Sequence, residues 1–281
     1  MSETNTIPVD SAANVYPEAA SREMIEAGVF YGRQKSKTNP KMRQYVLTQR
    51  AGIEIINLAQ TAEAMEKAIA FLKEKVRNGG FALFVGTEPS AEAGIKELSK
   101  KYNMPYVTDR WAGGTITNFK VLSKRIEYFK KLRSDLSSGA LINKYTKKER
   151  LDLEKDLERL LELFGGLELL TKEPDVLVVI DPKLHDTAVR EAQRAKIPVI
   201  ALANVDSNPD VIDYLVPGND RAVKSINWFL GKIDGALKDG LALRAKAALE
   251  AARIEAEKAS EKNAAKDGKE GIKHVKKADE N

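Results

Sequence analysis

The sequence contains no cysteine and only two histidines among its 281 residues. Without cysteine the chain cannot form disulfides, cysteine-based zinc sites or iron–sulfur clusters, and it has no thiol nucleophile. A site with three histidine ligands is impossible, because the chain has only two histidines. These two, His185 and His274, also lie far apart in the sequence. We therefore expect neither a metal site nor a cofactor.

Long apolar runs are also missing. No stretch approaches the roughly 20 apolar residues that a membrane-spanning helix needs. The first 20 residues have neither the basic start nor the apolar middle of a secretory signal, and they are polar enough to predict a flexible arm. We therefore expect a cytoplasmic protein that has no membrane partner.

The excess of positive charge is small, because 46 Lys and Arg stand against 41 Asp and Glu, for a net charge of +5. The position of the charges is more informative than their sum. Between Glu26 and Glu54 the chain holds no acidic residue, but it holds Tyr31, Tyr45 and six cations. Cations neutralise phosphates and planar rings stack on bases, so this stretch predicts RNA binding; a solvated basic surface loop is the alternative. The cations are Arg33, Lys35, Lys37, Lys41, Arg43 and Arg50.

Apolar runs and helical repeats alternate along most of the chain. Ser21 is a plausible cap for a short helix that stops at Gly28, and the turn 49–52 between apolar residues predicts a β-hairpin. The expected strands are 81–86, 105–107, 175–181, 197–203 and 213–216, and the expected helices are 61–77, 90–102, 186–196 and a long one from about Asn219. This alternation predicts an α/β domain with a parallel sheet and helices on both faces.

Two helices interrupt the alternation. Apolar residues recur every three or four positions in each, which is typical of a narrow packing seam. They are Phe119, Leu122, Ile126, Phe129 and Leu132 in the first helix and Leu153, Leu157, Leu160 and Phe164 in the second. We predict an inserted antiparallel coiled-coil hairpin, with ordinary sheet-covering helices as the alternative. The first helix is basic and the second acidic, so either the two pair or a basic face points outward.

The segment RWAGGTITNF at 110–119 follows a predicted strand, where α/β sheets bind ligands. Arg110 and Trp111 could hold a phosphate or a base, and Thr117 or Asn118 could cap the following helix. The alternative is a tight structural turn with Trp111 in the core.

An enzyme remains a competing hypothesis. Asp181 ends a predicted strand and precedes His185 by four residues, and Asp206 follows the next strand. An aspartate–histidine pair could support acid–base chemistry or hold a metal, although two ligands are too few to predict a metal site. The glycine spacing after the strand 81–86 matches no nucleotide-binding motif, and no nucleophile elbow occurs. We interpret His185 as a surface residue at a helix start. A scaffold that binds no RNA is the third hypothesis.

Together the motifs resemble the ribosomal protein S2 family of the bacterial small subunit. The motifs that carry the resemblance run from about Ser21 to Lys238: GVFYGRQ, NPKM, FVGT, RWAGGTITNF, FGGLELL, PDVLVVIDP, IPVIALANVDSNPD and IDYLVPGNDRAVKSI. The resemblance implies a flavodoxin-like α/β domain with a protruding coiled-coil hairpin. It also implies a non-catalytic structural protein of the small ribosomal subunit, bound to 16S ribosomal RNA and to neighbouring ribosomal proteins, including protein S-one, with no small-molecule substrate.

The family's Gly-His-Gln turn corresponds to Gly32-Arg33-Gln34, so the sequence departs from the family at the middle position. A role that needs imidazole there is not carried over, whereas Arg33 suits a phosphate contact. The residues expected at RNA are Arg33, Gln34, Lys35, Lys37, Asn39, Lys41, Arg43, Arg50, Arg110, Trp111, Thr115, Asn118, Lys120 and Lys124.

The expected organisation has four parts. Residues 1–20 form the arm, and 21–118 with 165–240 form the RNA-binding α/β domain. Residues 119–164 form the hairpin insertion, and 241–281 form a charged C-terminal helix and tail.

Overall fold

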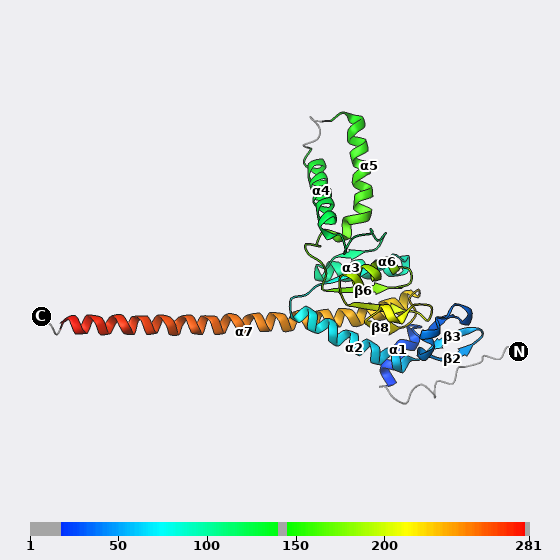
Figure 1. Ribbon diagram of the computed structural model, residues 1–281, viewed down its shortest axis with the longest axis horizontal. Coiled ribbons are helices and arrows are strands. Elements are labelled where there is room, and N and C mark those ends of the chain that lie inside the picture. Colours follow the sequence, from blue (N-terminus) through cyan, green and yellow to red (C-terminus); the bar gives the residue numbers. More distant parts are fainter. Residues whose placement is uncertain (1–17, 140–144, 279–281) are drawn as a thin grey trace.

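The computed structural model describes the backbone of residues 18–139 and 145–278 and the side chains of residues 22–139 and 145–250. Figure 1 shows an α/β body, a two-helix arm that stands away from it, and a long C-terminal helix that leaves it in another direction. The helices are α1 (Glu18–Glu26), α2 (Leu58–Arg77), α3 (Pro89–Tyr102), α4 (Phe119–Ser137), α5 (Lys147–Phe164), α6 (Asp186–Arg194) and α7 (Val223–Ala278). In the described part of the chain, no helix is long and apolar enough to span a bilayer.

A parallel sheet of five strands forms the centre of the body, in the order β5-β4-β6-β7-β8. Its strands are β4 (Ala82–Val85), β5 (Tyr106–Val107), β6 (Val176–Ile180), β7 (Val199–Ala203) and β8 (Tyr214–Pro217). The ends of each strand lie within two residues of the ends predicted from the apolar runs. The α/β class with a parallel sheet is therefore confirmed.

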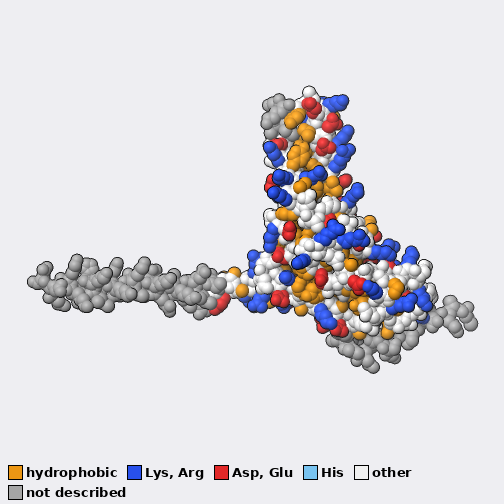
Figure 2. All heavy atoms as spheres, in the orientation of Figure 1, with side chains coloured by type: hydrophobic (Ala, Val, Ile, Leu, Met, Phe, Trp, Pro, Cys, Tyr) orange, Lys and Arg blue, Asp and Glu red, His pale blue; other side chains and the backbone are white. Residues whose placement is uncertain are grey.

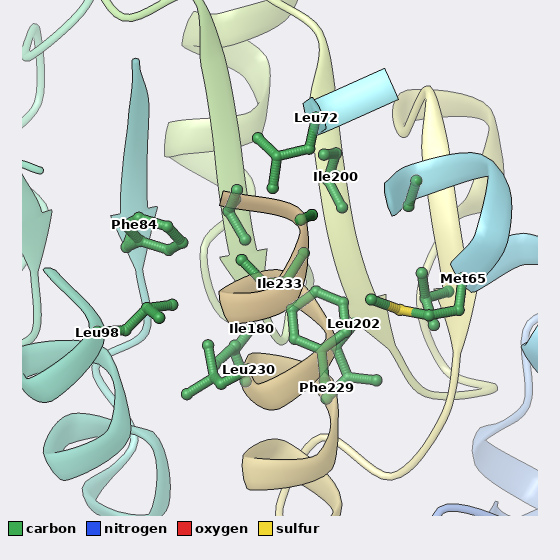
Figure 3. Packing of buried hydrophobic residues seen from close by; sticks show 14 of the residues in the cluster. Met65, Leu72, Phe84, Leu98, Ile180, Ile200, Leu202, Phe229, Leu230 and Ile233 are labelled. Carbon is green, nitrogen blue, oxygen red and sulfur yellow. The ribbon is translucent and has the colours of Figure 1, made fainter. Parts of the chain in front are cut away.

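Successive residues of these strands enter two separate hydrophobic cores, because side chains alternate between the faces of a sheet. On one face, Phe84, Ile180 and Ile200 pack against α2, α3 and α7, and Figure 3 shows them among Leu72, Leu98 and Phe229. On the other face, Val85 and Val179 pack with residues of α4 and α6. Since both faces are covered, the strands are apolar throughout instead of alternating.

A second, antiparallel sheet lies beside the first, with the order β1-β3-β2. It consists of β1 (Tyr31–Gln34), β2 (Val46–Arg50) and β3 (Ile53–Ile56). The predicted hairpin is confirmed, and its turn places Ala51 and Gly52 at positive φ, as tight hairpin turns require. Strand β1 was not predicted from the sequence, because its four residues Tyr-Gly-Arg-Gln lack apolar alternation.

Helices α4 and α5 run side by side in opposite directions and form the arm (Figure 1). On α4 the predicted apolar residues Leu122, Ile126, Phe129 and Leu132 are buried. On the described part of α5, Phe164 alone is buried, while Leu157 and Leu160 are partly buried. A capping box between Thr146 and Glu149 begins α5, and these hydrogen bonds hold the pKa of the Glu149 carboxyl below its usual value.

Three predicted helix starts are wrong. Helix α2 begins at Leu58 and not at Thr61, because Asn57 already caps it. Ser21 lies within α1 instead of capping it, because the helix already begins at Glu18. The long helix begins at Val223 and not near Asn219, whose side chain accepts hydrogen bonds from the backbone of Arg221 and Ala222 in the preceding turn. The predictions for residues 1–17 and 279–281 lie outside the described residues.

Candidate nucleic-acid interface

Residues 31–50, here called the basic segment, consist of β1, two 3₁₀ helices (Lys35–Lys37 and Pro40–Tyr45) and β2. Four of its cations are exposed and form no ion pair with any described residue. They are Lys35, Lys37, Arg43 and Arg50. Gln34 and Tyr31 are also exposed, and the exposed fraction of Tyr31 is 46%. The segment therefore presents cations and one aromatic residue to solvent, the groups that neutralise phosphates and stack on bases.

Two other predicted residues attach this segment to the body. Asn39 caps the second 3₁₀ helix by accepting a 3.0 Å hydrogen bond from the backbone of Lys41, and its own backbone N–H donates to Val205 over 2.9 Å. The exposed ammonium of Lys41 pairs with Asp210. An exposed ion pair contributes little to stability, so Lys41 can exchange this partner for a phosphate at small cost.

Arg33 does not point into solvent with the other cations. Its Nη2 lies 2.7 Å from Oδ1 of Asp220, and its Nε lies 3.6 Å from Oδ1 of Asp206. Its side chain is only 15% exposed, and that of Asp220 is fully buried. Arg33 was predicted to contact a phosphate, but in the structure it already has two carboxylate partners within the protein.

Burial, together with the negative charge of Asp181, raises the pKa of Asp220 to about 6. Arg33 and a hydrogen bond from Asn204 act in the opposite direction but do not cancel the cost of burial. Asp220 therefore changes its charge near neutral pH, unlike an ordinary surface aspartate.

The turn after β5 is organised by Glu191 of α6. Its two carboxylate oxygens accept hydrogen bonds of 2.8–3.2 Å from Nε1 of Trp111, from the backbone of Gly114, Ile116 and Thr117, and from the Thr117 hydroxyl. Burial alone would raise the pKa of Glu191, but these donors outweigh it and hold that pKa below its usual value. The turn has a fixed shape because one buried carboxylate binds most of its polar groups.

The predicted residues of this turn have different environments. Arg110 and Asn118 are exposed, whereas Trp111 is half-buried and its N–H is already bonded to Glu191. Thr115 is fully buried and donates to the carbonyl of Ala112 over 2.6 Å, so we leave it out of the proposed surface. Asn118 occupies the cap position of α4, but its side chain makes no capping hydrogen bond.

The cations of α4 face solvent. Lys120 and Lys124 are exposed, as are three further cations of this helix: Arg125, Lys130 and Lys131. Among the described residues no ion pair joins an α4 cation to an α5 carboxylate, although Arg133 pairs with Glu168 beyond α5. Figure 2 shows Lys and Arg along both sides of the arm and over the small sheet. Apart from Arg133, the cations of α4 therefore stay exposed to solvent without an ion-pair partner among the described residues.

The topology brings these surfaces to one edge of the body. Arg110 follows β5, while Asn39 and Arg33 contact the loops that follow β7 and β8. All five strands are parallel, so their carboxyl ends share an edge, with β5 and β8 at its two ends.

The residues of the enzyme hypothesis serve the fold. His185 is buried: its Nδ1 lies 2.9 Å from the carbonyl of Asp181, and its Nε2 accepts from the Thr87 backbone over 3.1 Å. Our interpretation of His185 as a surface residue is therefore wrong, since the ring links the ends of β4 and β6. Asp181 accepts from the backbone of Lys183 and Leu184, and Asp206 pairs with Lys183 over 3.0 Å.

Sequence reasoning missed Glu191 and Asp220. Glu191 shares the apolar face of α6 with Ala188 and Ala192, and an acid on such a face signals a buried partner. Asp220 lies in a loop rich in Asp and Asn, a composition equally typical of ordinary turns. Its pairing with Arg33, 187 residues away in sequence, leaves no local signal.

The sequence is similar to one family model and to several known proteins. The family model described as ribosomal protein S2 matches residues 24–240. The "Small ribosomal subunit protein uS2" of Thermus thermophilus is 41% identical over 215 residues, which cover 76% of this chain and 84% of the relative. The protein of the same name from Dictyoglomus thermophilum is 40% identical over 227 residues, covering 81% and 92%. The "Small ribosomal subunit protein uS2c" of Cyanophora paradoxa is 41% identical over 218 residues, covering 78% and 93%.

Proposed function

The chain belongs to the ribosomal protein S2 family, and from that premise we propose that its basic segment and the exposed cations of α4 bind 16S ribosomal RNA. The protein is a structural constituent of the small ribosomal subunit and not an enzyme. Its partners are accordingly ribosomal RNA and ribosomal proteins. We propose protein S-one as one of the protein neighbours, as the family resemblance implies.

One observation carries the RNA proposal: the exposed cations of the basic segment lack carboxylate partners among the described residues. Cations that pair within a protein must exchange one partner for another on binding, whereas unpaired cations gain a partner and release counterions. The unpaired cations of the basic segment are Lys35, Lys37, Arg43 and Arg50. Arg110, Lys120 and Lys124 extend the same surface to the turn and the arm.

The finer architecture is also part of the proposal. The strand order corresponds to 2-1-3-4-5 in chain order, which supports a flavodoxin-like domain formed by residues 21–118 and 165–240. The buried apolar residues of α4, spaced by three and four, support a coiled-coil insertion at 119–164. Residues 241–281 form the fourth part, and their backbone is helical as far as Ala278.

The test is the salt dependence of binding to a 16S ribosomal RNA transcript. For the variant Lys35→Ala/Lys37→Ala/Arg43→Ala, the slope of log affinity against log salt should become shallower by about 0.9 for each phosphate that the variant no longer neutralises. The affinity at physiological salt should fall by at least about tenfold. Filter binding across a salt series measures both quantities.

A matched control removes the same charge elsewhere. Arg77, Lys100 and Arg194 are exposed at the ends of α2, α3 and α6, on the edge of the body opposite the basic segment. Replacing these three with Ala should leave the slope within about 0.3 of the wild type. Equal slopes for both triple variants would count against the basic segment as the interface, and failure of the wild type to bind the transcript would favour a scaffold without RNA.

A further inference from the structure

Arg33 lies in an acidic cluster formed by the loops that follow β6, β7 and β8. Its guanidinium spans Asp220, at 2.7 Å from Nη2, and Asp206, at 3.6 Å from Nε. Because Asp220 is fully buried, removing Arg33 would leave a buried carboxylate without its ion-pair partner. Breaking this pair should therefore cost more free energy than breaking one of the exposed ion pairs elsewhere on the molecule.

Further polar groups face this pair. Lys183 lies 3.0 Å from Asp206, the charge of Asp181 acts on Asp220, and Asn204 donates to Oδ1 of Asp220 over 3.2 Å. Three carboxylates therefore share two cations. The second oxygen of Asp220 has no hydrogen-bond partner among the described residues. With all three carboxylates ionised, the cluster has a net charge of −1. Asp220 is the carboxylate that would take up a proton.

Arg33 joins the start of the basic segment to this cluster. Strand β1, which carries Arg33, lies so close to β3 that a Cβ on Gly32 would be 2.7 Å from the carbonyl oxygen of Glu54. The chain returns to the loop after β7 at Asn39, whose N–H donates to Val205. Lys35 and Lys37 lie between these two attachments and are exposed.

We propose that Arg33 and Asp220 are positioning residues for RNA binding: their buried ion pair holds Lys35 and Lys37 where they meet phosphates, and protonation of Asp220 releases this hold. The inference rests on the proposed function. It assigns Arg33 an indirect role, distinct from that of the exposed cations beside it.

The direction of the pH effect follows from linkage. The charge of Arg33 lowers the pKa of Asp220, so that pKa is about 6 with Arg33 in place and higher once Arg33 has left. The anchored state is therefore favoured above pH 6 and loses its advantage as the pH falls through 6. If the anchored state alone binds RNA, affinity should fall about fourfold between pH 7.5 and pH 5.5.

The first measurement compares wild type and Asp220→Asn for affinity to the 16S ribosomal RNA transcript at both pH values. The variant mimics the protonated acid, so it should bind several-fold more weakly at pH 7.5 and should lack the fourfold pH effect. A charge effect alone predicts the opposite, because removing a negative charge strengthens RNA binding. The charge-matched control Asp186→Asn, at an exposed site on α6, should keep the wild-type profile. Equal pH profiles for wild type and Asp220→Asn would overturn the inference.

The second measurement separates a positioning role from a direct contact. Arg33→Met should lower the affinity, because Lys35 and Lys37 must then be ordered on binding. It should leave the salt slope unchanged, because both lysines still reach their phosphates in the complex. A slope shallower by about 0.9 would make Arg33 itself a phosphate contact and would overturn the inference. Arg33→Lys, which keeps the charge, should restore part of the affinity.

The third measurement needs no RNA. At pH 7.5, amide hydrogens of residues 31–50 should exchange several-fold faster in Asp220→Asn than in the wild type, while those of β4 and β6 should not change. Unchanged exchange together with RNA binding that depends on Lys35 and Lys37 would refute the anchor and keep the proposed function. Faster exchange in a protein whose wild type binds no RNA would refute the proposed function, and the positioning role with it.

Discussion

At the scale of single residues, Glu191 shows how one buried carboxylate can fix a surface turn. It receives hydrogen bonds from three backbone N–H groups and from the side chains of Trp111 and Thr117. Its pKa in the folded protein is below the ordinary value. Its contribution to the free energy of unfolding is therefore present above the ordinary glutamate pKa and is lost as the pH falls through the lowered pKa.

We predict that Glu191→Ala lowers the free energy of unfolding by about 2–4 kcal/mol at pH 7, because buried donors lose their acceptor. Glu191→Gln keeps one acceptor oxygen and should lose less. Urea unfolding followed by circular dichroism measures both values. The exposed neighbour Gln193→Ala serves as the control, and a Glu191→Ala value no larger than that of the control would contradict this role.

Asp220 changes the free energy of unfolding with pH in the direction opposite to Glu191. Burial raises its pKa from 3.8 to about 6, so the folded chain holds this proton more tightly than the unfolded chain does. Its contribution to the free energy of unfolding therefore increases as the pH falls from about 7 toward 4. The anchor of Arg33 weakens over the upper part of the same range, so local order and global stability change in opposite directions.

At the scale of elements, the sequence predicted what local periodicity determines. The strands of the parallel sheet are apolar on both faces, and the first arm helix has a regular apolar seam, so both were recognisable. Burial of Thr115 and the inward course of Arg33 were not recognisable, because each depends on partners that are distant in sequence. A threonine or arginine in a polar loop looks the same whether it is exposed or buried.

The arm allows a sharper test of the proposed insertion. Residues Leu122–Leu132 of α4 and Phe164 of α5 belong to the core under the sheet, so only the outer part of the arm is dispensable. We predict that replacing residues 134–152 with a short Gly-Ser linker leaves a single cooperative thermal transition within a few degrees of the wild type. Loss of that transition would contradict the insertion model, whereas removal of the whole range 119–164 should unfold the body.

At the scale of the whole molecule, the charge is small in sum and uneven in place. Exposed cations concentrate on the basic segment and on α4, while much of the acidic charge lies on α5 and inside ion pairs. The net charge of +5 therefore understates the attraction that RNA would experience at the basic edge.

In a cell lysate, we predict that the protein sediments with the small ribosomal subunits. The variant Lys35→Ala/Lys37→Ala/Arg43→Ala should move toward the top of a sucrose gradient, because weaker phosphate contacts dissociate during the run. The control Arg77→Ala/Lys100→Ala/Arg194→Ala should stay with the subunits. Co-sedimentation of both variants to the same extent would assign retention to protein neighbours instead of to the basic segment.

The acidic cluster has one more consequence, for small molecules. Open α/β sheets receive their ligands beside the carboxyl ends of the strands, and Arg33 fills that place here with a group from the same chain. A tethered group competes at an effective concentration on the order of millimolar or higher. Arg33 would therefore outcompete a dissolved guanidinium or polyamine at micromolar concentration for these carboxylates.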